Sequence, residues 1–299
     1  MYSPLLLVVS VILFKVVLSE AAADLLVAIP TVPRPRLLER EEPYLLQSLS
    51  AWRKVLDGDL NFTIRIVVVS HEEDDETFAE AKRLYGTTFE FISHKEVQER
   101  STGENEECLA SEDAGGLEIR RPVFKHVQKQ ALDLARTMRI VSKRFPFDKY
   151  FVLIEDDFVP CEDFLSRMRD ILDIKAPNYG DWLSIRISYG FTGVVLRNGP
   201  DVLRVSDYIV RHRSRRPPDH LLVEFCAGET QEARDYKRTR PHLAFRYNLL
   251  EHIGKASTLR VRRDDSPKLD CLAPLGVPIL FEVETCQDFG NQDLCAPTA

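Results

Sequence analysis

The sequence predicts an α/β fold in which a mostly parallel β-sheet is flanked by helices. Short apolar segments typical of buried strands alternate with longer segments whose apolar residues recur at helical spacing. One apolar segment, residues 150–154, is continuous and rich in aromatic and branched residues, as in a strand covered on both faces. Three carboxylates follow it directly, and then Pro160. A central strand therefore ends here, and its carboxyl end concentrates negative charge.

Three further strands and two helices are predicted in the first third of the chain. The strands are short apolar runs bounded by prolines or polar residues, and the helices carry apolar residues at spacings of three and four. The predicted strands are residues 24–29, 62–69 and 89–92, and the predicted helices are residues 43–56 and 77–85. Residues 96–116 are polar, with few large apolar side chains, which predicts a surface loop.

A long helix leads into the central strand. Residues 123–145 carry apolar side chains at helical spacing, and Pro146 ends the pattern. Beyond the carboxylates, the sequence predicts helices at residues 162–171 and 202–210 and a strand at residues 181–187. No G-x-G-x-x-G or G-x-x-x-x-G-K-S/T segment occurs, which argues against a dinucleotide dehydrogenase or a P-loop enzyme.

Residues 1–23 are predicted to be a targeting segment. Residues 5–18 are apolar apart from Ser10 and Lys15, and three alanines follow at residues 21–23. This length suits the core of a signal peptide and is short for a spanning helix. Because no basic residue precedes the apolar run and Lys15 lies within it, an uncleaved signal-anchor is the alternative. Both interpretations place the remaining chain in the lumen of the secretory pathway.

Cysteine content and charge are consistent with this compartment. The six cysteines are Cys108, Cys161, Cys226, Cys271, Cys286 and Cys295. They include no C-x-x-C pair, and the sequence does not determine how they pair. Asn61 lies in the one Asn-x-Ser/Thr acceptor sequence. The net charge is −7 and the only basic block is residues 211–216, which argues against nucleic acid as a partner.

The carboxylates after the central strand are Glu155, Asp156 and Asp157. Like charges at a buried strand end repel one another and resist desolvation. A divalent cation relieves both penalties, and Mg²⁺ and Mn²⁺ favour oxygen ligands. Open α/β sheets also bind their ligands at the carboxyl ends of strands. The sequence therefore predicts a metal and ligand site here, with a solvated acidic turn as the alternative.

Four further residues are candidate site residues. Gly190 and Gly193 follow the 181–187 strand and permit a sharp turn or a close approach to a ligand. Asp219 follows two prolines, so it is either a helix N-cap or a carboxylate that a stiff segment aims into the site. His252 precedes a glycine and a hydroxyl-rich loop, which makes it a candidate metal ligand, with a structural role as the alternative.

The order of these segments resembles one enzyme family. The strand ending in Glu155-Asp156-Asp157 is followed by Asp181-Trp182, Gly190-Phe191-x-Gly193, Pro218-Asp219-x-Leu221-Leu222 and His252-x-Gly254. This order, over residues 122–259, resembles the N-acetylglucosaminyltransferase IV family, which adds β1,4-linked N-acetylglucosamine to the α1,3-mannose arm of N-glycans. A related family, which adds an N-acetylgalactosamine side branch to GPI anchors, shares the strand with Glu-Asp-Asp. That family carries extra membrane spans, for which this sequence shows no apolar run.

The resemblance implies a GT-A type catalytic domain at residues 24–265, followed by a cysteine-containing tail at residues 266–299. It implies a UDP-sugar donor, a glycan acceptor and Mn²⁺ or another divalent cation, with Asp157 and His252 as metal ligands. The residues implied in donor binding are Glu155, Asp156, Gly190 and Gly193. Asp219 matches the family's carboxylate that deprotonates the acceptor hydroxyl, and Glu224 is the second candidate for this base. Because the family's luminal stem and lectin-like region have no counterpart here, the resemblance does not fix the acceptor.

Two hypotheses of different class follow. The first is an inverting glycosyltransferase of the Golgi lumen that moves N-acetylglucosamine from UDP-GlcNAc to a mannose of an N-glycan, with the GPI-type activity as its variant. The second is a secreted carbohydrate-binding relative without turnover. The acidic triplet together with Asp219 and His252 favours the enzyme, because a binding module needs neither a base nor a metal. A phosphohydrolase that uses the acidic triplet is disfavoured because Glu155-Asp156-Asp157 lacks the nucleophilic Asp-x-Asp arrangement. Membrane contact is expected only through an N-terminal anchor.

Overall fold

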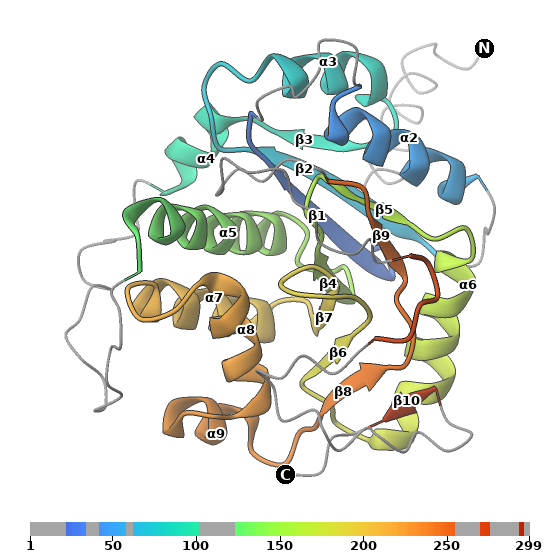
Figure 1. Ribbon diagram of the computed structural model, residues 1–299, viewed down its shortest axis with the longest axis vertical. Helices are drawn as coiled ribbons and strands as arrows, with labels where there is room; N and C mark the ends of the chain where they lie inside the picture. Colours follow the sequence, from blue (N-terminus) through green and yellow to red (C-terminus); the bar gives the residue numbers. More distant parts are fainter. Residues whose placement is uncertain are drawn as a thin grey trace, which may run out of the picture.

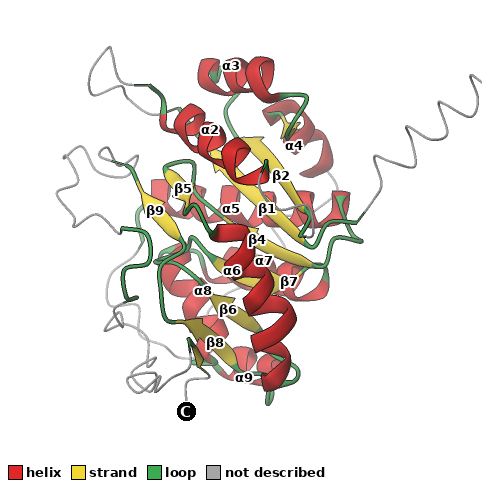
Figure 2. Ribbon diagram, turned by 90° about the vertical axis from the view of Figure 1, so that its right-hand side faces the viewer, coloured by secondary structure: helices red, strands yellow, loops and turns green. Residues whose placement is uncertain are grey.

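The computed structural model describes residues 22–33, 42–57, 62–101, 123–254, 270–275 and 293–295. Within these ranges the chain forms an eight-stranded sheet with helices on both faces (Figures 1 and 2). The predicted α/β class is confirmed. No helix in the described ranges is long and apolar enough to cross a membrane. Residues 1–21 of the predicted targeting segment and Asn61 lie outside these ranges.

The strands of the main sheet lie in the order β10-β8-β6-β7-β4-β1-β2-β3. Their bounds are β1 (Leu25–Thr31), β2 (Ile64–Ser70), β3 (Glu90–Ile92), β4 (Tyr150–Leu153), β6 (Ser184–Arg186), β7 (Val194–Arg197), β8 (His242–Phe245) and β10 (Leu294–Cys295). Four of the seven neighbouring pairs are parallel. Because β7 runs antiparallel to both β4 and β6, those two strands are parallel and their carboxyl ends lie at one edge of the sheet.

Helices cover both faces of the sheet (Figure 1), and a hydrophobic layer lies between the sheet and the helices on each face. One layer contains side chains of α2 (Tyr44–Leu56), α3 (Glu76–Tyr85) and α6 (Phe164–Arg169). The other contains side chains of α4 (His94–Ser101), α5 (Lys125–Arg144), α7 (Pro200–His212), α8 (Pro218–Ala227) and α9 (Gln231–Lys237). We call these the α2 face and the α5 face. Strands β4 and β1 are apolar on both sides because both of their faces are covered.

Several elements differ from the expectation. The predicted loop 96–116 begins as helix α4, and its residues from 102 onward lie outside the described ranges. The helix expected at residues 162–171 continues beyond α6 as a π-helix, Asp170–Lys175, and a 3₁₀ turn, Ala176–Tyr179. Strands β5, β7, β8 and β9 were not expected, because runs of three or four residues are too short to show a period.

A second sheet of two antiparallel strands, β5 (Phe158–Pro160) and β9 (Leu250–His252), lies on the α2 face. Cys161, which follows β5, forms a disulfide with Cys271. The Asn248 amide donates to the carbonyl of Ala273 at 2.9 Å, which fastens the segment 270–275 beside β9. The described parts of the predicted tail are therefore bonded to the main domain, the second of them as strand β10.

Candidate active site

The three carboxylates lie where β4 leaves the carboxyl edge of the main sheet. The backbone is still held by the sheet at Ile154, whose amide donates to the Ala28 carbonyl at 3.0 Å. Asp156 is buried, and its Oδ2 accepts a hydrogen bond from the Thr31 hydroxyl at 2.9 Å. Because Thr31 is the last residue of β1, this bond ties the carboxylates to the neighbouring parallel strand.

Glu155 contacts the turn between β6 and β7. Thr192 Oγ1 donates to Glu155 Oε2 at 3.1 Å and accepts from the Glu155 amide at 3.3 Å. Thr192 stands between Gly190 and Gly193, whose φ angles of +66° and +80° favour glycine. A Cβ on Gly193 would also lie 2.6 Å from the Cβ of Ser188. The two candidate glycines therefore shape a tight turn, and Thr192, which gave no sequence signal, joins that turn to the acidic triplet.

Asp157 is brought to His252 by the small sheet. Phe158 pairs with His252 in the β5–β9 register, and the Ile253 amide donates to the Asp157 carbonyl at 2.9 Å. Asp157 Oδ2 and His252 Nε2 then lie 3.3 Å apart. The Asp157 side chain is 8% exposed and that of His252 is 23% exposed, so the pair is sheltered and still reachable.

Gly254 keeps the space beside this pair open. A Cβ at residue 254 would lie 2.4 Å from Asp157 Oδ2 and 2.8 Å from His252 Nε2, closer than unbonded atoms approach. The backbone therefore passes directly against the two ligand-type atoms. This contact gives a physical reason for a glycine two residues after His252.

The Asp157–His252 pair fits two adjacent positions around a divalent cation. At metal–ligand distances of about 2.1 Å, neighbouring ligands of an octahedral ion lie about 3 Å apart. Among the described residues no third His, Cys, Asp or Glu completes a metal-binding group. An ion held by two protein ligands suits Mg²⁺ or Mn²⁺, which keep waters and take further oxygens from substrate phosphates.

A cavity of about 460 Å³ opens beside the triplet, on the α5 face. Glu155 and Asp156 line one part of it, and the carboxyl ends of β1 and β2 and the first half of α5 line the rest. Its apolar wall includes Pro30 and Val32. Its size lies within the range of pockets that hold a small molecule or a cofactor.

The polar wall of the cavity contains His71 and Asp133, neither of which we singled out from the sequence. His71 Nε2 is 2.7 Å from Thr137 Oγ1, and His71 Nδ1 is 3.7 Å from Asp133 Oδ1. Burial, helped by the charges of Arg136 and Lys129, lowers the pKa of His71 to about 3. Burial also raises the pKa of Asp133. At neutral pH the imidazole of this wall is uncharged, and both it and the Asp133 carboxyl group offer hydrogen-bonding atoms.

Asp219 is the second residue of α8, and its side chain is 44% exposed. The N-cap of α8 is Pro217, and no side-chain cap bond is formed, so Asp219 is not the helix cap that the sequence allowed. Its carboxylate is 3.9 Å from His220 Nε2. It does not line the cavity described above.

The carboxyl end of α8 is anchored at the amino ends of β6 and β8. Cys226, which is buried and free, hydrogen-bonds to Ser184 at the start of β6. Lys237 Nζ donates to the Ala227 carbonyl at 3.1 Å, and the Lys237 charge contributes to the lowered pKa of His242 at the start of β8. The amino end of α8, with Asp219, therefore points toward the carboxyl edge that carries the triplet.

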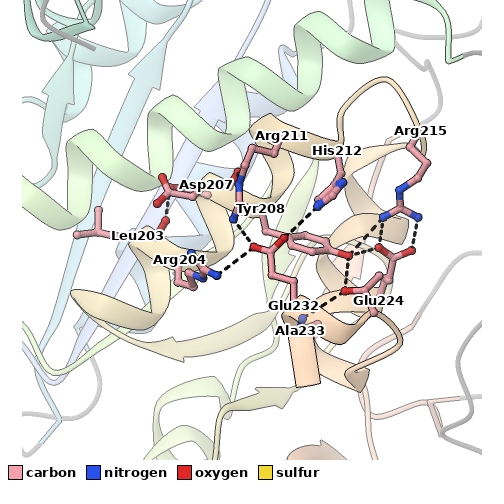
Figure 3. A network of polar contacts seen from close by, with 12 residues as sticks. Leu203, Arg204, Asp207, Tyr208, Arg211, His212, Arg215, Glu224, Glu232 and Ala233 are labelled. Carbon is pink, nitrogen blue, oxygen red and sulfur yellow. Dashed lines mark hydrogen bonds and ion pairs between the residues drawn. The ribbon is translucent and has the colours of Figure 1, made fainter. Parts of the chain in front are cut away.

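Glu224, the second candidate base, lies inside a closed ionic network (Figure 3). Its carboxylate is bonded to Arg215 and Tyr208, and Arg216 Nη1 lies 2.9 Å from its Oε2. Burial alone would raise the pKa of Glu224, but the hydrogen bonds from Arg215 and Tyr208 outweigh it and lower that pKa. A carboxylate that two arginines hold ionised is a weak proton acceptor, so the geometry favours a structural role.

No protein-family model and no curated protein matches the chain. Solved structures with a resembling arrangement include a glycosyltransferase involved in the glycosylation of the major capsid of PBCV-1, at 11% identity and a TM-score of 0.30, over 64% of this chain and 68% of that chain. S. aureus TarS 1-349 is 10% identical, with a TM-score of 0.33, over 64% and 56%. Mouse xyloside xylosyltransferase 1 is 12% identical, with a TM-score of 0.37, over 68% and 82%. Likenesses this weak do not identify an activity for this chain.

Proposed function

We propose that the chain is a divalent-metal-dependent, inverting glycosyltransferase that uses a UDP-sugar. Its proposed donor is UDP-GlcNAc, its proposed acceptor is a mannose of an N-glycan, and its proposed location is the Golgi lumen. The observation that carries the proposal is the pair of Asp157 and His252, held 3.3 Å apart by the β5–β9 sheet, next in sequence to Glu155 and Asp156, which line a ligand-sized cavity. The donor, the acceptor and the compartment rest on the resemblance of the motifs.

The burial of the acidic triplet favours a binding site for a metal and a nucleotide sugar over a solvated acidic turn. A solvated turn would leave its carboxylates in water, whereas Asp156 and Asp157 are 4% and 5% exposed. Burial of adjacent carboxylates carries a desolvation cost that a bound cation offsets. The cavity on the other side of Glu155 and Asp156 leaves room for the nucleoside, with hydrogen-bonding groups on its wall.

The proposed chemistry is a single displacement. The acceptor hydroxyl oxygen forms a bond to the anomeric carbon, and the bond from that carbon to the diphosphate oxygen breaks. The electron pair leaves with UDP, and Asp219 takes the proton from the hydroxyl. A bound divalent cation would neutralise charge developing on the diphosphate. Asp157 and His252 would hold that cation, while Asp156 would contact the sugar or ribose.

A donor screen tests the proposal. The chain would be incubated with Mn²⁺, a set of UDP-sugars and a glycan panel, and transfer and donor hydrolysis would be measured. We expect transfer from UDP-GlcNAc that chelation abolishes and that Asp157→Asn removes. Asp74→Asn, an exposed carboxylate outside the site, is the matched control and should keep full activity. Glycan binding without transfer or hydrolysis of any UDP-sugar would instead favour the carbohydrate-binding relative.

A further inference from the structure

Arg186, the last residue of β6, is a buried arginine whose Nε has no polar partner among the described residues. Its side chain belongs to a residue that is 3% exposed, and its Nε is fully buried with no acceptor. In the part of the chain that the structure describes, this Nε meets no hydrogen-bond acceptor, and no carboxylate charge acts on the guanidinium. Two ionisable groups of the described residues interact electrostatically with it, and neither is a carboxylate. They are the phenol of Tyr189 and the imidazole of His242.

Two other sheltered arginines of this protein are each paired with an aspartate. Arg65 Nε is 2.8 Å from Asp148 Oδ2, and Arg240 Nη1 is 2.9 Å from Asp201 Oδ1. A guanidinium does not lose its proton in proteins, so burial without an anion carries an uncompensated desolvation cost. Arg186 therefore lacks the anion that this protein supplies elsewhere, and a ligand can provide it.

The position of Arg186 indicates which substrate could reach it. Arg186 pairs with Val194 of β7 and with Ala244 of β8, and Val194 belongs to the hydrophobic layer of the α5 face. Its side chain is therefore on the α5 face, together with α8 and Asp219. The Asp157–His252 pair lies with the β5–β9 sheet on the α2 face. Arg186 and the Asp157–His252 pair therefore lie at the same carboxyl edge of the sheet but on opposite faces.

We propose that Arg186 binds an oxyanion, a phosphate or a carboxylate, carried by the glycan acceptor. This inference rests on the proposed function, in which the diphosphate of the donor is bound on the Asp157–His252 side. The cavity assigned to the nucleoside also lies on the α5 face, but Arg186 does not line it. Asp219, the proposed base, belongs to α8 on the same face as Arg186, so we assign the oxyanion to the ligand that carries the accepting hydroxyl. The acceptor is then an anionic glycan rather than a neutral one.

The first test is a comparison of stability without substrate. Arg186→Met replaces an unpaired buried charge with an apolar chain of similar length, so Tm should rise by about 2 °C or more. Arg65→Met is the matched control on β2, and it should lower Tm because the buried Asp148 carboxylate loses its ion-pair partner and keeps, among the described residues, only the hydrogen bond from the Ala23 amide. A fall in Tm for Arg186→Met comparable to that for Arg65→Met would mean that Arg186 has a structural partner, and would overturn the proposal.

The second test uses pairs of acceptors that differ only in one phosphate or carboxylate group. The wild type should prefer the anionic member, and Arg186→Met should raise the acceptor KM by about 10- to 100-fold, as for loss of a charged hydrogen bond. Arg186→Lys keeps the charge without the planar fork and should give an intermediate KM. The Kd for UDP, measured by calorimetry, should change less than about twofold. Loss of UDP affinity would assign the oxyanion to the donor and overturn an anionic acceptor, as would equal use of both acceptors.

A third measurement separates this inference from the proposed function. If no UDP-sugar supports transfer, the proposed function fails, and oxyanion binding is then read from stabilisation by inorganic phosphate. The wild type should gain Tm with phosphate, and Arg186→Met should gain less. Equal gains in both proteins would overturn the role of Arg186 independently of any activity.

Discussion

Asp157 Oδ2 and His252 Nε2 lie 3.3 Å apart although the two residues are 95 positions apart in the sequence. The contact exists because β5 and β9 pair with Phe158 opposite His252. We expect Asp157→Ala and His252→Gln each to weaken Mn²⁺-dependent binding of UDP by more than about 100-fold, beyond the usual cost of losing an outer-shell partner. The fold should remain, because Asp157→Ala also relieves repulsion among the carboxylates. Calorimetry with and without chelator measures this, and UDP affinity insensitive to both would contradict the assignment.

Gly254 provides a steric test of the same site. In Gly254→Ala the new methyl group would lie 2.4 Å from Asp157 Oδ2, so the pair must separate and metal affinity should fall. Gly86→Ala is a matched control, because its methyl group would lie 2.5 Å from the Lys82 carbonyl oxygen, at the end of α3. Both variants should lose some stability, but only Gly254→Ala should lose Mn²⁺ binding. Equal metal affinity in the two proteins would argue against this site.

Asp219 is tested by a substitution that removes a proton acceptor and little else. Because no cap bond depends on its side chain, Asp219→Asn should leave Tm unchanged. As the proposed base, its loss should lower the rate of transfer by ~10²–10⁴-fold with UDP affinity retained. The readout is single-turnover transfer beside a melting curve. Transfer at the wild-type rate would remove Asp219 from the mechanism.

Glu224 should behave in the opposite way. Glu224→Gln removes the anion that Arg215 and Arg216 share, so the free energy of unfolding should fall by about 3 kcal/mol. Since the folded protein lowers the pKa of Glu224, this contribution is present at neutral pH and is lost as pH falls below about 4.5. Urea unfolding at pH 7 and pH 4 measures both effects. A stable variant without transfer would make Glu224 the base after all.

Two buried histidines predict a steep loss of stability in acid. Burial lowers the pKa of His71 and of His242 to about 3, whereas an imidazole in the unfolded chain titrates near 6.5. As pH falls from about 6.5 toward 3, the unfolded chain takes up protons that the folded protein does not. Stability should therefore drop by about 1.4 kcal/mol per pH unit for each histidine. Denaturant unfolding across this range measures the slope of the unfolding free energy against pH. In His242→Gln one fewer proton is taken up on unfolding, so this slope should be smaller. An unchanged slope in that variant would exclude His242 as a source of the acid sensitivity.

The strands and helices with the clearest periods could be predicted, and the contacts that assemble the site could not. The run at residues 150–154 is apolar on both faces, so β4 and the acidic triplet after it were visible in the sequence. Strand β9 has only three residues, and its partner β5 lies about 90 positions earlier in the chain, so no local pattern reveals the pairing. Arg186 showed no signal, because a strand of three residues does not reveal which side chains are buried.

Strand β10 gives the tail a protective role. The Tyr179 hydroxyl donates to the Leu294 carbonyl at 2.5 Å, and the Arg246 amide donates to the Asp293 carbonyl at 2.7 Å, so these last described residues are held along β8. Without them, the apolar strand β8 would be the outermost strand, with unbonded backbone groups facing outward. An exposed apolar edge is a template on which a second chain can add a strand. By pairing with β8, strand β10 occupies the edge on which a second chain could otherwise add a strand, at the side of the sheet opposite β3.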